Sequence, residues 1–116
     1  MESSDITLRV FRSGDVVEAI TWRADEGTGP DEQAAKAFIL ALWDAKERSA
    51  LRIDLWTRDM TVDDMNDFFF QTLMTMADTY ANATTFAPLA GEIKVFAQEF
   101  AEKAARATRR SLGQAG

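Results

Sequence analysis

Two residue types are missing from this 116-residue chain, which contains no cysteine and no histidine. The lack of cysteine excludes a disulfide, a zinc-thiolate site, a thiol redox centre and a cysteine nucleophile. The lack of histidine removes the commonest general base and the commonest transition-metal ligand. Long apolar runs are also missing, since no segment approaches eighteen uninterrupted apolar residues, and we therefore expect no membrane insertion.

Positive charge is scarce. Nineteen acidic and thirteen basic residues give a net charge of −6, and such a field repels nucleic-acid phosphates and anionic lipid headgroups. We therefore expect no nucleic-acid partner. The opening "MESSDITLRV" also lacks the basic region of a secretory signal. We expect a soluble, unexported protein that resides in the cytoplasm or peripherally at the inner membrane.

The first half of the chain contains three predicted strands and one predicted helix. Apolar and polar residues alternate over 6–11, 16–23 and 51–56, which is the period of a half-buried strand. Gly14 supplies a turn between the first two segments. Between the second and third strands, Pro30 is followed by acidic residues and by apolar residues at helical spacing up to Trp43. This pattern predicts a helix that begins near Pro30.

Two further helices are predicted in the second half. Thr61 with Asp64 three residues later forms a capping-box pattern, with Asp in place of the usual Glu, before a helix from Val62 to about Asn82. That helix is apolar on two sides. Pro88 then restarts a helix with a single apolar stripe made of Leu89, Ile93, Phe96 and Phe100.

The resulting element order is β-β-α-β-α-α, in one α+β domain that covers residues 1–116. The helix between the second and third strands allows the third strand to lie beside the first. We therefore predict a three-stranded antiparallel sheet in the order 2-1-3, with the helices packed on one face. Residues 107–116 have little apolar content, and we expect them to form a disordered tail.

An acidic cluster is the one candidate for chemistry. Carboxylates bind hard cations, so a metal-binding module or a carboxylate-based hydrolase is an alternative function. The spacing matches no calcium-binding loop, and acidic residues in the first turn of a helix are already favoured there by its dipole. A small-ligand carrier with an apolar pocket is a further alternative. The acidic group includes Asp54, and the alternative function would use the cluster of Asp59, Asp63, Asp64 and Asp67.

The segment from Leu42 to Thr84 closely resembles the gliding-motility-associated protein C (GldC) family. The resemblance rests on "LRIDLWT", "DM", "FF", "QTL" and "MADT" in that order, which is not a generic helical pattern. It implies an accessory protein linked to gliding motility, with no established enzymatic activity and no cofactor. The family offers no catalytic residues, and the C-terminal "ARATRRSLGQAG" matches no family signature.

We therefore expect a non-catalytic protein that acts through protein-protein contacts, with other motility-machinery components as partners. The helix from Val62 carries more apolar surface than a narrow helix readily covers, and such a patch is typical of an interface. On that basis we predict a homodimer. The candidate interface residues are Trp56, Phe68, Phe70, Met74, Phe96 and Phe100.

Overall fold

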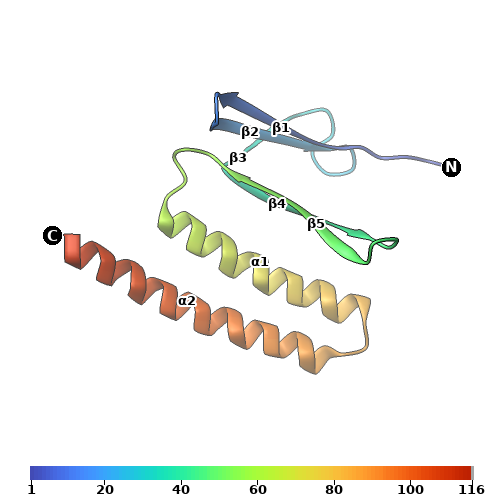
Figure 1. Ribbon diagram of the computed structural model, residues 1–116. Coiled ribbons are helices and arrows are strands. Elements are labelled where there is room, and N and C mark those ends of the chain that lie inside the picture. Colours follow the sequence, from blue (N-terminus) through green and yellow to red (C-terminus); the bar gives the residue numbers. More distant parts are fainter. Residues whose placement is uncertain (116) are drawn as a thin grey trace. The chain divides into compact units, whose positions relative to one another are not determined.

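The protein is described by a computed structural model that covers residues 1–115, with side chains up to Ser111. The chain divides into two compact units, residues 1–60 and 61–116. The first unit contains all the described strands and the second contains both described helices (Figure 1). That the whole chain forms one domain stays a prediction.

The first unit begins with a three-stranded antiparallel sheet in the order β1-β2-β3. Its strands are β1 (Ile6–Ser13), β2 (Val16–Ala24) and the short β3 (Gln33–Ala35). The predicted hairpin is confirmed, and Gly14 in its turn has a φ of 61°, a value that glycine adopts without strain. The predicted strand order is wrong, because the central strand is β2 and its second neighbour is β3.

A β-bulge interrupts the hairpin at Glu18. Phe11 pairs with Ala19 and Arg12 pairs with Val17, so that Glu18 has no partner in the register of β1. Such an insertion changes which face the following side chains occupy. Val17 and Ile20 are therefore both buried, although strict alternation assigns them to opposite faces.

The second sheet of this unit is the antiparallel ribbon of β4 (Ala37–Asp44) and β5 (Ser49–Trp56). The strand predicted over 51–56 is confirmed. The helix predicted from Pro30 to Trp43 is wrong, because these residues form β3 and β4. Pairing with β5 along the whole length of β4 decides the conformation of this apolar run. In the turn, the Asp44 carboxylate accepts hydrogen bonds from the amides of Lys46 and Glu47.

The end of β5 is tied to the other strands of the first unit. The Thr57 amide donates to the carbonyl of Lys36 (2.8 Å), and the Arg58 amide donates to the carbonyl of Val17 (3.0 Å). Arg58 also forms an ion pair with Glu18 in the bulge (3.2 Å). Thr57 is buried, and its hydroxyl donates to Asp59. The α+β class is confirmed, but the described strands form two sheets instead of one. Packing of helices on one sheet face stays a prediction.

In the second unit, α1 (Val62–Ala83) begins at the predicted cap. The Thr61 hydroxyl accepts from the amide of Asp64 (3.0 Å), and the Asp64 carboxylate accepts from the amide of Thr61 (3.2 Å). This is a reciprocal capping box, so the shorter aspartate does replace glutamate here. The second helix, α2 (Ala87–Ala115), continues through most of the segment 107–116 that is predicted to be a tail. Gly116 lies outside the described residues.

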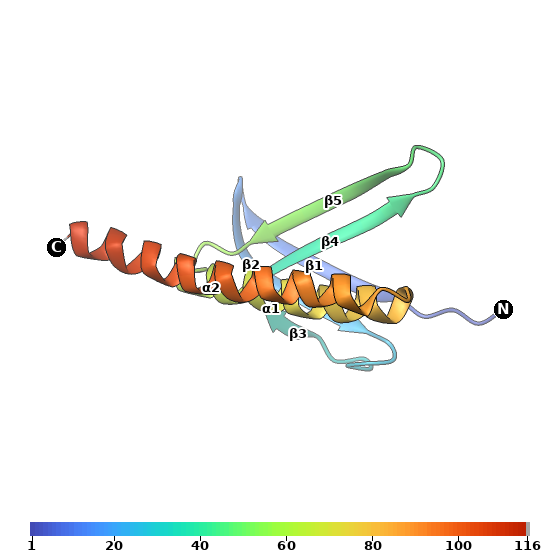
Figure 2. The ribbon, with the colours of Figure 1, turned by 90° about the horizontal axis from the view of Figure 1, so that it is seen from below.

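The two helices run antiparallel and pack against each other (Figure 1 and Figure 2). The seam between them is made of small residues. Ala77 of α1 and Ala90 and Ala97 of α2 are buried, and small side chains allow two helix backbones to approach closely. Polar contacts cross between the helices towards either end. Asn66 donates to the Thr108 hydroxyl (2.9 Å), and Lys94 pairs with Asp78 (2.7 Å).

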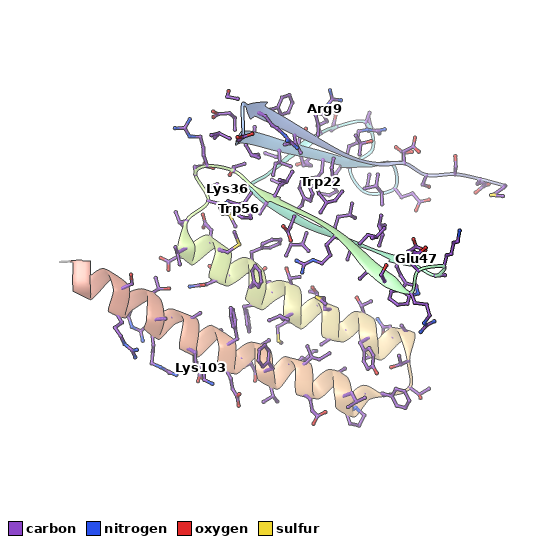
Figure 3. All side chains as sticks on the ribbon, in the orientation of Figure 1. Arg9, Trp22, Lys36, Glu47, Trp56 and Lys103 are labelled. Carbon is purple, nitrogen blue, oxygen red and sulfur yellow. The ribbon has the colours of Figure 1, made fainter. Side chains whose placement is uncertain are left out.

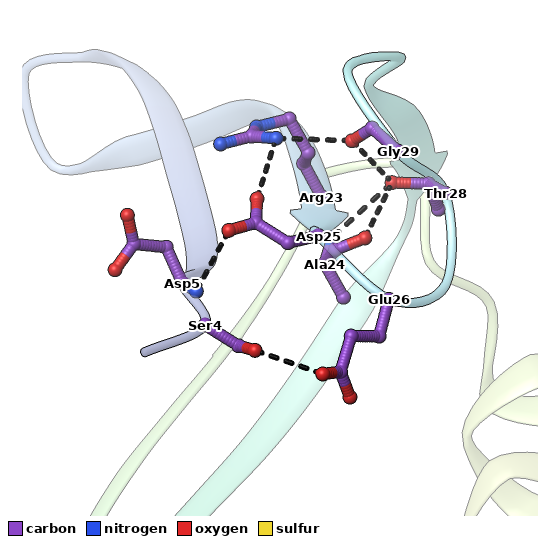
Figure 4. A network of polar contacts seen from close by, with 8 residues as sticks. All are labelled: Ser4, Asp5, Arg23, Ala24, Asp25, Glu26, Thr28 and Gly29. Atoms are coloured by element: carbon purple, nitrogen blue, oxygen red, sulfur yellow. Dashed lines mark hydrogen bonds and ion pairs between the residues drawn. The ribbon is translucent and has the colours of Figure 1, made fainter. Parts of the chain in front are cut away.

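A polar network closes the loop after β2 (Figure 4). The Asp25 carboxylate accepts from the amide of Asp5 (3.0 Å) and pairs with the Arg23 guanidinium (2.9 Å). Arg23 also donates to the carbonyl of Gly29. The hydrogen bond from the Asp5 amide, assisted by the charge of Arg23, lowers the pKa of Asp25 below its usual 3.8.

Asp25→Asn should destabilise the protein at neutral pH and have less effect in acid. A carboxylate with a lowered pKa stabilises the fold above its unfolded-state pKa, and this contribution is lost as the pH falls through its folded-state pKa. The urea midpoints of the variant and the natural protein should therefore differ more at pH 7 than at pH 3, which lies below the usual pKa of 3.8. An equal difference at both pH values would show that the charge of Asp25 is not responsible.

Candidate interaction surfaces

One face of the β4–β5 ribbon carries three successive pairs of large apolar side chains, followed at the turn by the pair Asp44–Ser49. Paired residues of an antiparallel ribbon point to the same side, and the register pairs Phe38 with Leu55, Leu40 with Ile53, and Leu42 with Leu51. We call these six residues the apolar ribbon face. Leu42, Leu51 and Ile53 are each more than half exposed. The alternation predicted over 51–56 thus does place Leu51, Ile53 and Leu55 on one face, but in the structure Leu51 and Ile53 are exposed instead of buried in a core.

The edges of the ribbon are open as well. Among the described residues, β4 pairs only with β5 and β5 only with β4. The sequence of β4, "AFILALWD", carries no charge before Asp44 and no proline. Natural edge strands are usually protected by such residues, and an unprotected edge favours pairing with another chain. A two-stranded ribbon is also marginally stable unless something packs on it.

The opposite face of the ribbon is mixed in character. It carries Trp43 and Trp56, both more than half exposed, and an ion pair between Arg52 and Asp54 (2.9 Å). Arg48 lies over the ring of Trp43 near the ribbon tip, which Glu47 marks in Figure 3. Trp56 borders an open hollow of about 420 Å³ that is lined from β2, β5 and the segment just after β5. Trp56, predicted as an interface residue, is therefore accessible to a partner.

The helix pair has an apolar side of its own. One open hollow is lined by side chains from both helices, and the rings of Phe69 and Phe100 lie 6.4 Å apart. Among the large apolar side chains that line this hollow, Met76 and Phe96 are the most exposed. The apolar side of the helix pair comprises Phe69, Leu73, Met76 and Tyr80 of α1 and Leu89, Ile93, Phe96 and Phe100 of α2.

The predicted interface residues of the helices differ in their exposure and in the surface to which they belong. Phe96 is exposed and Phe100 half-buried, and both belong to the apolar side of the helix pair. Phe68, Phe70 and Met74 are all half-buried. Phe70 lines a hollow between α1 and α2 together with Ala101 and Ala105, so part of its surface serves contact within the helix pair.

Two members of the acidic cluster, Asp59 and Asp64, are held by local contacts. Asp59 accepts from the Thr57 hydroxyl (2.6 Å), and this hydrogen bond, with a smaller contribution from the charge of Lys36, lowers the pKa of Asp59. Asp64 belongs to the capping box, and Asp63 lies with it in the first turn of α1. Within the described part of the chain, no group of three or more His, Cys, Asp or Glu residues is placed to hold a metal ion. No described helix is both long and apolar enough to cross a membrane.

Comparison with protein families gives one result. The family model "Gliding motility-associated protein GldC-like" matches residues 17–106. The chain belongs to the GldC-like family. The match includes every residue of both apolar surfaces, and it ends at Arg106, within the C-terminal segment that shows no family signature in the sequence. No curated protein and no solved structure matches the chain.

GldC-like membership connects the chain with gliding motility but names no activity, ligand or partner. The apolar stripe of α2 is readable from helical spacing in the sequence. The apolar ribbon face was missed, because half of it lies on residues predicted to be helical. The available signal was the uninterrupted apolar run of β4 ahead of a turn at Asp44, a pattern that fits a strand as well as a helix.

Proposed function

We propose that this GldC-like protein is a non-catalytic accessory protein that acts through protein-protein contacts within a gliding-motility-associated assembly. Family membership supports the connection with motility. The observation that supports contact with another protein is the apolar ribbon face, whose six large side chains lie on a ribbon with open edges. As part of the same proposal, the protein works in the cytoplasm or at the surface of the inner membrane.

The ribbon suits a protein contact for two reasons. Burial of apolar surface contributes about 25 cal/mol per Å², so half-exposed leucine and isoleucine side chains gain from being covered. The unpaired backbone groups of β4 can in addition form hydrogen bonds with an extended apolar segment of the partner, which would add a strand to the ribbon. The apolar side chains of that partner segment would pack against the apolar ribbon face.

The carboxylate-based alternative has less support. Asp59 and Asp64 are engaged by Thr57 and Thr61, and acidic residues at the start of α1 are favoured by the helix dipole. These contacts account for the positions of the carboxylates without a ligand.

The proposal can be tested in the source organism by measuring colony spreading on a soft surface. Deletion of the gene should reduce spreading. A chromosomal Leu42→Asp/Ile53→Asp variant should reproduce the spreading defect of the deletion, because contact at the apolar ribbon face would bury two unpaired charges. The variant protein should accumulate to its normal level, since both positions are exposed.

Val95→Asp is the matched control, because Val95 is as exposed as these residues but lies on α2. A strain that carries Val95→Asp should spread normally. Normal spreading after deletion of the gene would overturn the motility role. Normal spreading of the double variant, with reduced spreading of the deletion strain, would overturn the role of the ribbon.

A further inference from the structure

The second unit offers another apolar surface, and its construction indicates what covers it. Its described elements are two helices, and the seam between them is built from small residues that bury little apolar area. The large apolar side chains Met76 and Phe96 instead point away from the seam and are more than half exposed. Such a helix pair has an apolar side that is uncovered within the pair, and a second apolar surface packed on that side would complete a hydrophobic core.

We propose that a second copy of this chain packs on the apolar side of the helix pair, so that α1 and α2 of two copies form an antiparallel four-helix bundle. A two-fold axis lets the same surface serve both copies, and four-helix bundles are built from helix pairs of this kind. This proposal goes beyond the proposed function and does not depend on it, because self-association requires no motility partner.

The dimensions are sufficient for a stable contact. The two hollows on this side extend along α2 from Leu89 to Ala107, about 27 Å at 1.5 Å per residue, and two packed helices are about 19 Å wide. Each copy thus offers a flat area of about 500 Å², and the pair about 1,000 Å² before the relief of the side chains is counted. A specific interface begins at about this size.

The chemistry of the surface also fits self-association. Phe96 lines two neighbouring hollows on this side, and so it lies near the centre of the surface. Glu92, Glu99 and Lys103 border the same hollows, and Lys103 projects outward from α2 in Figure 3. An aromatic centre with charged residues around it is typical of interfaces in which the centre is desolvated and the rim stays hydrated.

The predicted homodimer is kept in this proposal, but its surface changes. Phe96 and Phe100 of α2 remain interface residues. The exposed Met76 replaces the half-buried Met74 on α1, because Met76 lines the hollow shared with α2.

The first test is the molar mass of the purified chain at tens of micromolar, by light scattering coupled to size exclusion. We expect about twice the 12.9 kDa of one chain. Phe96→Asp should yield the monomer mass, because it places a charge at the centre of the contact. Val95→Asp should remain dimeric, since Val95 is almost equally exposed (54% against 58%) but points about 100° away around the helix.

The second test keeps the interface intact, in case Phe96→Asp does not fold. The chain contains no cysteine, so a single engineered thiol can be cross-linked selectively. Glu92→Cys lies at the border of the contact, and a short bis-maleimide should link two copies. Glu102→Cys lies on another side of α2 by helical periodicity and should link them much less.

A monomer mass for the natural chain would overturn the dimer and leave the proposed motility role standing. A dimer that survives Phe96→Asp, with helical circular dichroism intact, would overturn the choice of surface. The same conclusion would follow if Glu102→Cys cross-linked as well as Glu92→Cys.

Discussion

Ile20→Ala should lower the free energy of unfolding by about 2–5 kcal/mol, as large-to-small substitutions in a packed core do. Ile20 is 1% exposed and is the largest side chain that is fully buried among the described residues. All three tryptophans, Trp22, Trp43 and Trp56, belong to the first unit. Tryptophan fluorescence during urea unfolding therefore measures the stability of the unit that contains Ile20.

Val16→Ala is the control for this experiment. Val16 lies on the same strand but is 44% exposed, so its loss should cost less than about 1 kcal/mol. Equal shifts of the urea midpoint for the two variants would mean that Ile20 is not a core residue.

Ala97→Leu should destabilise the helix pair by about 1–3 kcal/mol, because the larger side chain does not fit the seam. Ala97 is 0% exposed, and the helices approach each other along Ala77, Ala90 and Ala97. A leucine there forces the backbones apart or adopts a strained rotamer. The loss of helical circular dichroism on heating or in urea measures the effect, since the described helices both lie in the second unit.

Gln98→Leu provides the comparison on the same helix. Gln98 is exposed, and substitution there should change the stability by no more than about 0.5 kcal/mol. If Ala97→Leu changed the stability as little as the control, the seam at Ala97 would have space for a larger side chain, and the tight packing inferred from the buried alanines would be wrong.

The sequence predicts best those elements whose signals are local. The capping box at Thr61 needs only residues 61–64, and it marks the observed start of α1. Gly14 marks the turn of the first hairpin in the same way. Alternation likewise locates β5, because a strand with one apolar face has a period of two wherever it lies.

The segment from Pro30 to Asp44 shows where this approach fails. Alanine and leucine are good helix formers, and an uninterrupted apolar run has no period that distinguishes a helix from a strand. What makes it a strand is eight register pairs with β5, which lie outside the segment itself. Once β4 is taken for a helix, β5 is assigned to the wrong partner, the first strand, and the apolar ribbon face cannot be predicted.

The bulge at Glu18 is a second case in which a contact distant in sequence decides the outcome. Strict alternation places Val17 with Ala19 and Thr21, whereas the structure buries Val17 together with Ile20. Arg58 reaches Glu18 from forty residues away, a partner that no local pattern reveals. For the candidate interface, periodicity thus identifies Phe96 and Phe100 on a helix, but it does not identify the ribbon.

The ties at the end of β5 have a consequence for the order of folding. Every described strand pair and the helix pair join neighbours in the sequence, so each can form by closing a short loop. The link from Arg58 to Val17 and Glu18 instead closes a loop of about forty residues, which carries a larger entropic cost. We therefore expect the hairpins and helices to form first, and the docking of Arg58 beside the bulge to complete the first unit later.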